Sequence, residues 1–161
     1  MKVVSNTSPI INLAAINHLD VLRQVFGTIL IPQAVYHEIV VVGSGQPGAD
    51  EVQGANWIQV HAITNQPLIT VLTLSLDQGE AEAIALAVET QADLVLLDER
   101  MGRSVASHFG LKCIGLLGIL IEAKRTGVLP AVKPVLDDLR SKAGFWVSPA
   151  LYHQVLQTVD E

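Results

Sequence analysis

The stretch Leu94-Val95-Leu96-Leu97-Asp98 decides the fold, because a continuous apolar run ending at a carboxylate is typical of a buried parallel strand. A second such run, Val3-Val4-Ser5-Asn6, stands near the start of the chain. Helix-like segments alternate with these runs, which favours a parallel sheet covered by helices over a sandwich or a bundle. Ligands bind at the carboxyl edge of such sheets, so we expect Asn6 and Asp98 to lie at a functional site.

The remaining elements follow from apolar spacing and from turn residues. We expect further strands at 28–31, 57–60 and 112–114, and helices near 9–15, 18–25, 33–41, 78–90, 100–109, 116–125, 134–142 and 150–159. Residues 68–74 form either a short helix or a connector. The glycine-rich segment 43–48 is the clearest loop. No internal repeat is visible, so we expect one domain over residues 1–161.

Composition narrows the class of protein. Half of the 161 residues are apolar and 16% are charged, which indicates a folded chain with a substantial core. A net charge of −6 argues against a protein that coats nucleic acid through a basic face. Cys113 is the only cysteine, which excludes an intrachain disulfide. The most apolar stretch, 113–121, falls short of the roughly 20 residues that span a bilayer, and we expect a cytoplasmic protein without a membrane segment.

Two further carboxylates, Glu38 and Glu80, lie in expected helices that can border the same edge of the sheet. Carboxylates gathered at one place raise one another's pKa, and a bound cation removes that repulsion. Oxygen ligands suit Mg²⁺ or Mn²⁺, and no Cys/His cluster supports zinc. The sequence therefore predicts a site for one of these hard cations.

Each of these residues also has a purely structural interpretation. Glu80 lies three residues after Asp77, which is the spacing of a helix capping box. Asn6 and Asp98 can each cap the helix that follows, and Glu38 can be an exposed helix residue. Glu82 lies on a different side of its helix from Glu80, so only one of the two can face the site.

Five segments resemble the PIN-domain family of metal-dependent ribonucleases, in particular a bacterial branch often encoded beside small antitoxin-like proteins. These segments are VVSNTSPII (3–11), IPQAVYHEI (31–39), LDQGEAEAIALA (76–87), LDER (97–100) and GFWVSP (144–149). The resemblance implies an α/β/α sandwich with a parallel sheet of four or five strands. It also implies an acidic pocket that binds one or two Mg²⁺ or Mn²⁺ ions.

The resemblance places the family's acids at position 6, Glu38, Glu80 and Asp98, with Glu99 as a further acid. Asn6 departs from the pattern, because the family usually has aspartate there. An amide oxygen can coordinate a hard cation, but it brings no negative charge.

We therefore expect a metal-dependent enzyme that hydrolyses RNA phosphodiester bonds, and the resemblance implies a role as the toxin of a toxin–antitoxin pair. The metal would activate a water molecule and stabilise charge on the phosphate oxygens. Thr7 or Ser8 would orient that water, and Arg100 and Arg103 would bind the RNA backbone.

Two other functions stay open. A catalytically weak or inactive PIN fold would act as a nucleic-acid-binding or protein-binding module, with Asn6 as the sign of lost activity. A phosphotransfer receiver needs an acidic pair near the first strand, which Ser5 and Asn6 do not provide. Expected partners are RNA, a small antitoxin-like protein and a second copy of the chain. The homodimer is expected from apolar residues late in the sequence, among them Ile119, Leu120, Trp146 and Leu151.

Overall fold

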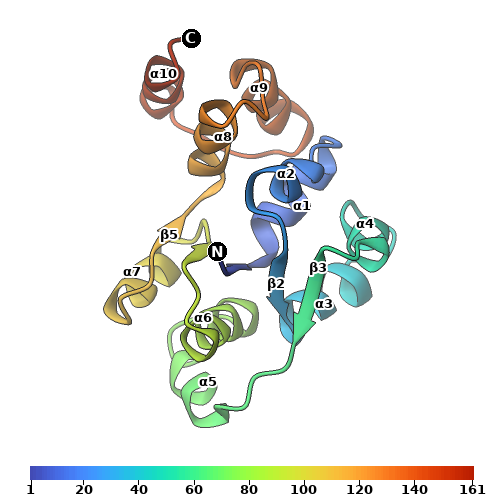
Figure 1. The fold of residues 1–161 in the computed structure, drawn as a ribbon, viewed down its shortest axis with the longest axis vertical. Helices are drawn as coiled ribbons and strands as arrows, with labels where there is room; N and C mark the ends of the chain where they lie inside the picture. Colours follow the sequence, from blue (N-terminus) through green and yellow to red (C-terminus); the bar gives the residue numbers. More distant parts are fainter.

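The computed structural model describes residues 1–161 and contains a five-stranded parallel sheet with helices on both faces (Figure 1). All strand pairings are parallel, and the spatial order is β3-β2-β1-β4-β5. The expected α/β/α fold is confirmed. The strands are β1 (Val3–Ser5), β2 (Ile29–Pro32), β3 (Ile58–His61), β4 (Leu94–Leu96) and β5 (Cys113–Ile114).

The helices follow the expected segments with two differences. A short helix, α4, forms where none was expected, and the segment expected to form one helix at 33–41 is divided into a turn of α-helix and a π-helix, η1. The helices are α1 (Thr7–Ala15), α2 (Asp20–Phe26), α3 (Gln33–Tyr36), η1 (His37–Val42), α4 (Ala49–Gly54), α5 (Gln66–Leu72), α6 (Gln78–Thr90), α7 (Arg100–His108), α8 (Leu116–Arg125), α9 (Lys133–Lys142) and α10 (Pro149–Thr158).

The sheet separates two hydrophobic cores, because successive side chains of a strand point to opposite faces. Val3 and Leu96 face the larger core, which also contains buried residues of α1, α2, α8, α9 and α10. Val4 and Val95 face the smaller core, which contains buried residues of α5, α6 and α7. Strands covered on both sides must be apolar throughout, and this explains why their sequences do not alternate with polar residues.

The order of the strands reverses between β1 and β4. From β1 the chain continues to β2 and β3 on one side, and it then crosses to β4 and β5 on the other side. Ser5 of β1 pairs with Leu96 of β4 in register, so the two strands end at the same level. Asn6 follows β1 directly and Asp98 follows β4 two residues later. Both residues therefore stand at the crevice where doubly wound sheets bind ligands.

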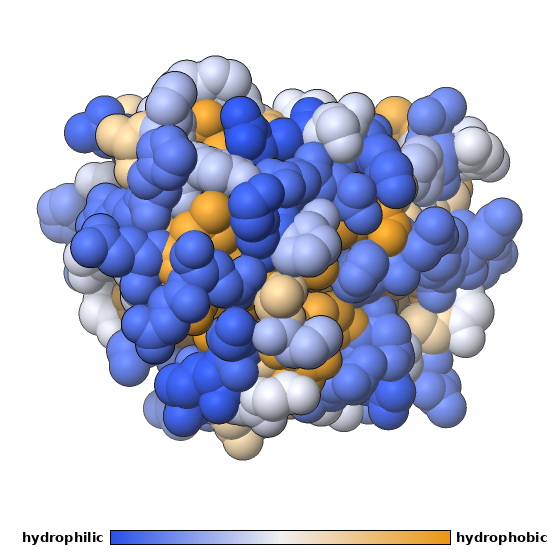
Figure 2. Space-filling model, turned by 90° about the horizontal axis from the view of Figure 1, so that it is seen from above, coloured by the Kyte–Doolittle hydropathy of each residue, from blue (hydrophilic) through white to orange (hydrophobic).

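The surface is largely hydrophilic, with separate apolar patches between the polar side chains on the face that Figure 2 shows. The expectation that Ile119 and Leu120 add apolar surface is wrong: both are fully buried, because α8 packs them into the larger core. Trp146 and Leu151 are exposed. None of the helices has the length and apolar character needed to cross a membrane.

Candidate active site

Asn6 is held by the sheet and leaves one polar atom without a partner. Its backbone N–H donates a hydrogen bond of 3.0 Å to the Leu96 carbonyl, which extends the pairing of β1 with β4. The side chain is 5% exposed and makes no capping hydrogen bond to α1, so the capping interpretation of Asn6 is wrong. Its Oδ1 is buried and accepts no hydrogen bond. A buried acceptor without a partner is costly, and a bound water molecule or cation would satisfy it.

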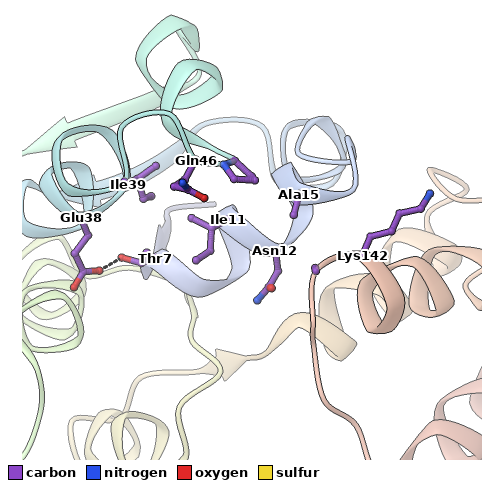
Figure 3. A pocket seen from close by; sticks show the side chains of 11 residues that line it. Thr7, Ile11, Asn12, Ala15, Glu38, Ile39, Gln46 and Lys142 are labelled. Atoms are coloured by element: carbon purple, nitrogen blue, oxygen red, sulfur yellow. Dashed lines mark hydrogen bonds between the residues drawn. The ribbon is translucent and has the colours of Figure 1, made fainter.

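Glu38 reaches the same place from the first turn of η1. Its carboxylate accepts a hydrogen bond from Thr7 Oγ1 at the start of α1 (Figure 3). A Cβ atom at Gly79 would lie 3.2 Å from each Glu38 carboxylate oxygen and 3.3 Å from Asn6 Oδ1. Asn6 and Glu38 therefore meet beside a glycine, where the absence of a side chain leaves space around their oxygens.

Glu80 both caps its helix and belongs to the acidic group. The Glu80 N–H donates to Asp77 Oδ1 at 2.8 Å, and the Asp77 N–H donates to Glu80 Oε2 at 3.2 Å, so the capping box is present. Burial raises the pKa of Glu80, the hydrogen bond from the Asp77 N–H offsets part of the rise, and the charges of Asp77, Glu99 and Glu38 add to it. The same carboxylate that caps α6 thus lies in a field of negative charge.

Asp98 caps α8 rather than α7. Its Oδ1 accepts a hydrogen bond of 2.8 Å from the Leu116 N–H, and Ser8 Oγ donates to its Oδ2 at 3.5 Å. A Cβ atom at Gly115 would lie 2.5 Å from Asp98 Oδ1, so only glycine fits there. Burial raises the pKa of Asp98, and the Leu116 N–H and the positive charge of Arg103 lower it in part.

The carboxylates surround one edge of the sheet without forming a closed set of ligands. No three Asp, Glu, His or Cys side chains lie close enough together to hold a metal ion. Glu38, Glu80 and Asp98 each use an oxygen to accept a hydrogen bond from another part of the chain. Desolvation and the charges of Asp98 and Asp77 also raise the pKa of Glu99, which joins the same group.

Other expected residues lie around this group. Arg100 and Arg103 are exposed on α7, and neither forms an ion pair. Glu82 points away, because its carboxylate accepts a hydrogen bond of 3.1 Å from the Ala34 N–H. Sequence reasoning missed Gly79 and Gly115, since only the packing of distant segments gives these glycines their role.

The residues fit a hard divalent cation in their chemistry. All candidate ligands are oxygens, one of them is the orphaned Asn6 Oδ1, and the space beside Gly79 is open to both Asn6 and Glu38. Glu80, Asp98 and Glu99 have raised pKa values, which a nearby cation would lower.

Two cavities adjoin the acidic group. The first has a volume of about 410 Å³ and lies between α1, η1 and the end of α9, with Thr7, Glu38, Gln46 and Lys142 among its lining residues (Figure 3). The second has a volume of about 460 Å³ and is lined by Asp98 together with residues of α7, β5, α8 and the segment before α10. The candidate site therefore opens on two sides, which suits an extended substrate that occupies both cavities.

The fold is that of a PIN-like α/β/α protein. A family model described as a PIN domain matches residues 2–161, and the chain belongs to this family. PIN domains are generally nucleases, bind nucleic acids and typically use divalent metals.

A solved structure supports the same fold. It is a PilT N-terminus domain protein from the hyperthermophilic archaeon Sulfolobus solfataricus P2, with a TM-score of 0.56 and 21% sequence identity. The match covers 74% of this chain and 90% of that chain. No curated protein matches the chain significantly.

Proposed function

We propose that this protein is a ribonuclease that depends on Mg²⁺ or Mn²⁺ and acts at the carboxyl edge of β1 and β4. The observation that carries the proposal is the buried Asn6 Oδ1, which has no hydrogen-bond partner and shares the space beside Gly79 with the Glu38 carboxylate. A buried acceptor next to a carboxylate is stabilised by a cation, and oxygen ligands suit these two metals.

Asn6, Glu38, Glu80 and Asp98 would hold the cation, with Glu99 as a further acid beside them. When bound, such a cation lowers the pKa of a water molecule and stabilises negative charge on phosphate oxygens. The chain's own residues position these groups. Thr7 Oγ1 fixes the Glu38 carboxylate and Ser8 Oγ contacts Asp98, and each hydroxyl keeps a lone pair that can accept a hydrogen bond from a water molecule and so orient it.

Arg100 and Arg103 would bind the phosphate backbone of the substrate. Both lie on α7 directly after Asp98 and Glu99, and neither is neutralised by an ion pair within the chain. Two positive charges at this place offset the acidic group locally, which a chain with a net charge of −6 requires if it is to bind RNA.

A second candidate function is a binding module with weak or no catalysis. Two observations favour it: Asn6 adds no negative charge, and Glu80 and Asp98 each cap a helix. A structural role for both acids would leave Glu38 as the main charged ligand. Such a protein would bind RNA or a partner protein without cleaving RNA.

The protein partners follow from the resemblance and from exposed apolar side chains. A small antitoxin-like protein is one proposed partner and a second copy of this chain is the other. Trp146 and Leu151 are exposed, as are Val41 and Val42 at the end of η1. Light scattering at micromolar concentration tests the homodimer, and a monomer mass would contradict it.

The nuclease proposal is tested with purified protein and a labelled single-stranded RNA. We expect cleavage in Mn²⁺ or Mg²⁺, none in EDTA, and a loss of more than about 100-fold in Asp98→Asn. Asp160→Asn is the matched control, because Asp160 is exposed and makes no side-chain hydrogen bond. Cleavage that persists in EDTA contradicts the proposal. RNA binding without cleavage under any condition supports the binding module instead.

A further inference from the structure

Trp146 is the most exposed aromatic side chain of the protein, and its place relative to the acidic group calls for an explanation. It lies in the segment that joins α9 to α10, and 80% of it is exposed. Its neighbours Phe145 and Val147 are half-buried and buried, so the segment itself is anchored. An indole that contributes so little to packing is available for a ligand.

Trp146 lines the same cavity as Asp98 and Arg103. This cavity, of about 460 Å³, joins the exposed indole to a carboxylate of the candidate site and to the arginine beside it. The Arg103 Nη1 atom lies 3.6 Å from the Cβ position of Gly115, the same position that the Asp98 carboxylate approaches. Arg103 makes no ion pair within the chain, so its guanidinium is free to donate hydrogen bonds to a phosphate.

Trp146 also lines a third cavity. It has a volume of about 530 Å³ and is lined by Arg140 as well as Trp146. Arg140 lies 4.5 Å above the Tyr152 ring, which holds its guanidinium at this surface. Asp137 lines the same cavity, but its carboxylate is engaged by Tyr152 Oη at 2.6 Å and Lys133 Nζ at 3.0 Å. Trp146 thus shares one cavity with Arg103 and another with Arg140.

We propose that Trp146 stacks on an unpaired base of a single-stranded RNA whose backbone passes from the acidic group over Arg103. An exposed indole with cations beside it is the arrangement that binds single strands, since every unpaired base has a face that can stack. The bases of a duplex are already stacked on one another and cannot use it. That the bound strand is RNA rests on the proposed function. Trp146 is then a positioning residue, because it binds the strand away from the phosphate that is cleaved.

The test measures binding without cleavage. The Asp98→Asn protein is titrated in Mn²⁺ against a short fluorescein-labelled oligouridine, and the same measurement is made after Trp146→Ala, Trp146→Phe and Leu74→Ala. We expect Trp146→Ala to raise Kd about tenfold, while Trp146→Phe keeps most of the affinity because it keeps a stacking face. Leu74 is the matched control, since it is 85% exposed and lines none of the cavities at the site.

Two further measurements separate the roles. Arg103→Ala is expected to lower the slope of log K against log salt by about one, as the loss of one phosphate contact does. In the otherwise unchanged protein, Trp146→Ala is expected to raise KM for RNA cleavage with little change in kcat, because the indole positions the strand and does not touch the reacting phosphate.

Several outcomes overturn the inference. Equal Kd values for Trp146→Ala and Leu74→Ala would do so, as would an equal loss of affinity for duplex RNA. An unchanged RNA Kd together with conversion of a dimer to a monomer by Trp146→Ala would assign the indole to a contact between two copies. Failure of the proposed function gives a different result: RNA binding that depends on Trp146 without cleavage by the unchanged protein supports the stacking site and contradicts the nuclease.

Discussion

Asn6 Oδ1 and the Glu38 carboxylate approach the same point, the position that a side chain at residue 79 would occupy, at 3.3 and 3.2 Å. The two residues come from different elements: Asn6 follows the first strand, and Glu38 lies in the first turn of the π-helix. Gly79, at the start of α6, lies beside both of them. Because residue 79 has no side chain, one cation can contact both Asn6 Oδ1 and the Glu38 carboxylate. A side chain at position 79 would occupy that space.

Gly79→Ala tests whether this space matters. Alanine in place of glycine ordinarily stabilises a helix, by up to about 1 kcal/mol in its interior, but Gly79 lies in the first turn of α6 and the added methyl group would lie 3.2 Å from the Glu38 oxygens. We expect little change in melting temperature, because the two effects oppose each other, and a fall in Mn²⁺ affinity of about tenfold or more. Calorimetry of Mn²⁺ binding and thermal melting provide the two measurements.

Gly54→Ala is the matched control for this substitution. Gly54 also lies in a helix, and a Cβ atom there would meet no atom within 4 Å. Its Mn²⁺ affinity should equal that of the unchanged protein. If Gly79→Ala also binds Mn²⁺ as tightly as the unchanged protein, the space beside Gly79 is not part of the metal site.

Most of the fold could be predicted from the sequence because the strands are buried on both faces. Val3-Val4 and Leu94-Val95-Leu96 are apolar without alternation, which is diagnostic of a covered parallel sheet. α4 could not be predicted, since its six residues follow a glycine-rich loop and carry no repeated apolar spacing. The π-helix η1 also escaped prediction, because residues 37–42 have no pattern that distinguishes one extra residue in a turn.

The candidate site could be predicted only in part. The positions of Asn6 and Asp98 follow from the ends of their strands, and the pairing of Asp77 with Glu80 follows from their spacing. The hydrogen bond from the Leu116 N–H to Asp98 joins residues far apart in the chain, and no local sequence pattern predicts it. The same holds for the bond from Thr7 to Glu38, which depends on how α1 packs beside η1.

The acidic group predicts a pH dependence of stability. Burial raises the pKa values of Asp98 and Glu80, so the folded state binds protons more tightly than the unfolded state. In metal-free protein these groups therefore favour folding at low pH, and that contribution is lost as pH rises through the unfolded and then the folded pKa. The window begins near pH 4, where unfolded carboxyl groups titrate.

Asp98→Asn isolates this effect. In EDTA, the melting temperature of the variant minus that of the unchanged protein should increase as pH rises from about 4 to 7. The reason is that the amide does not titrate, whereas Asp98 acquires an unfavourable charge in the folded protein. Surface carboxylates with lowered pKa values, such as Asp20 and Glu122, are common to both proteins and cancel in the difference. A difference in melting temperature that stays constant across this range would show that Asp98 carries no unfavourable charge.

The identity of the cation is tested by thermal melting. Since all candidate ligands are oxygens, Mn²⁺ at about 100 times its Kd should raise the melting temperature by roughly 5–10 °C. Mg²⁺ should act in the same direction, and Zn²⁺ should show no comparable effect, because no Cys/His set is present at the site. A larger shift with Zn²⁺ than with Mn²⁺ would contradict the assignment of oxygen ligands.

Asn6→Asp tests whether Asn6 Oδ1 is a metal ligand, because it changes the charge at position 6 with almost no change in shape. Mn²⁺ is titrated by calorimetry into the unchanged protein and into the variant. If Asn6 Oδ1 is a metal ligand, the added charge beside the cation should tighten binding by at least about tenfold and increase RNA cleavage. The account predicts measurable binding in the unchanged protein and this gain in the variant. The absence of Mn²⁺ binding by both proteins at millimolar concentration, or equal affinities in the two, would contradict it.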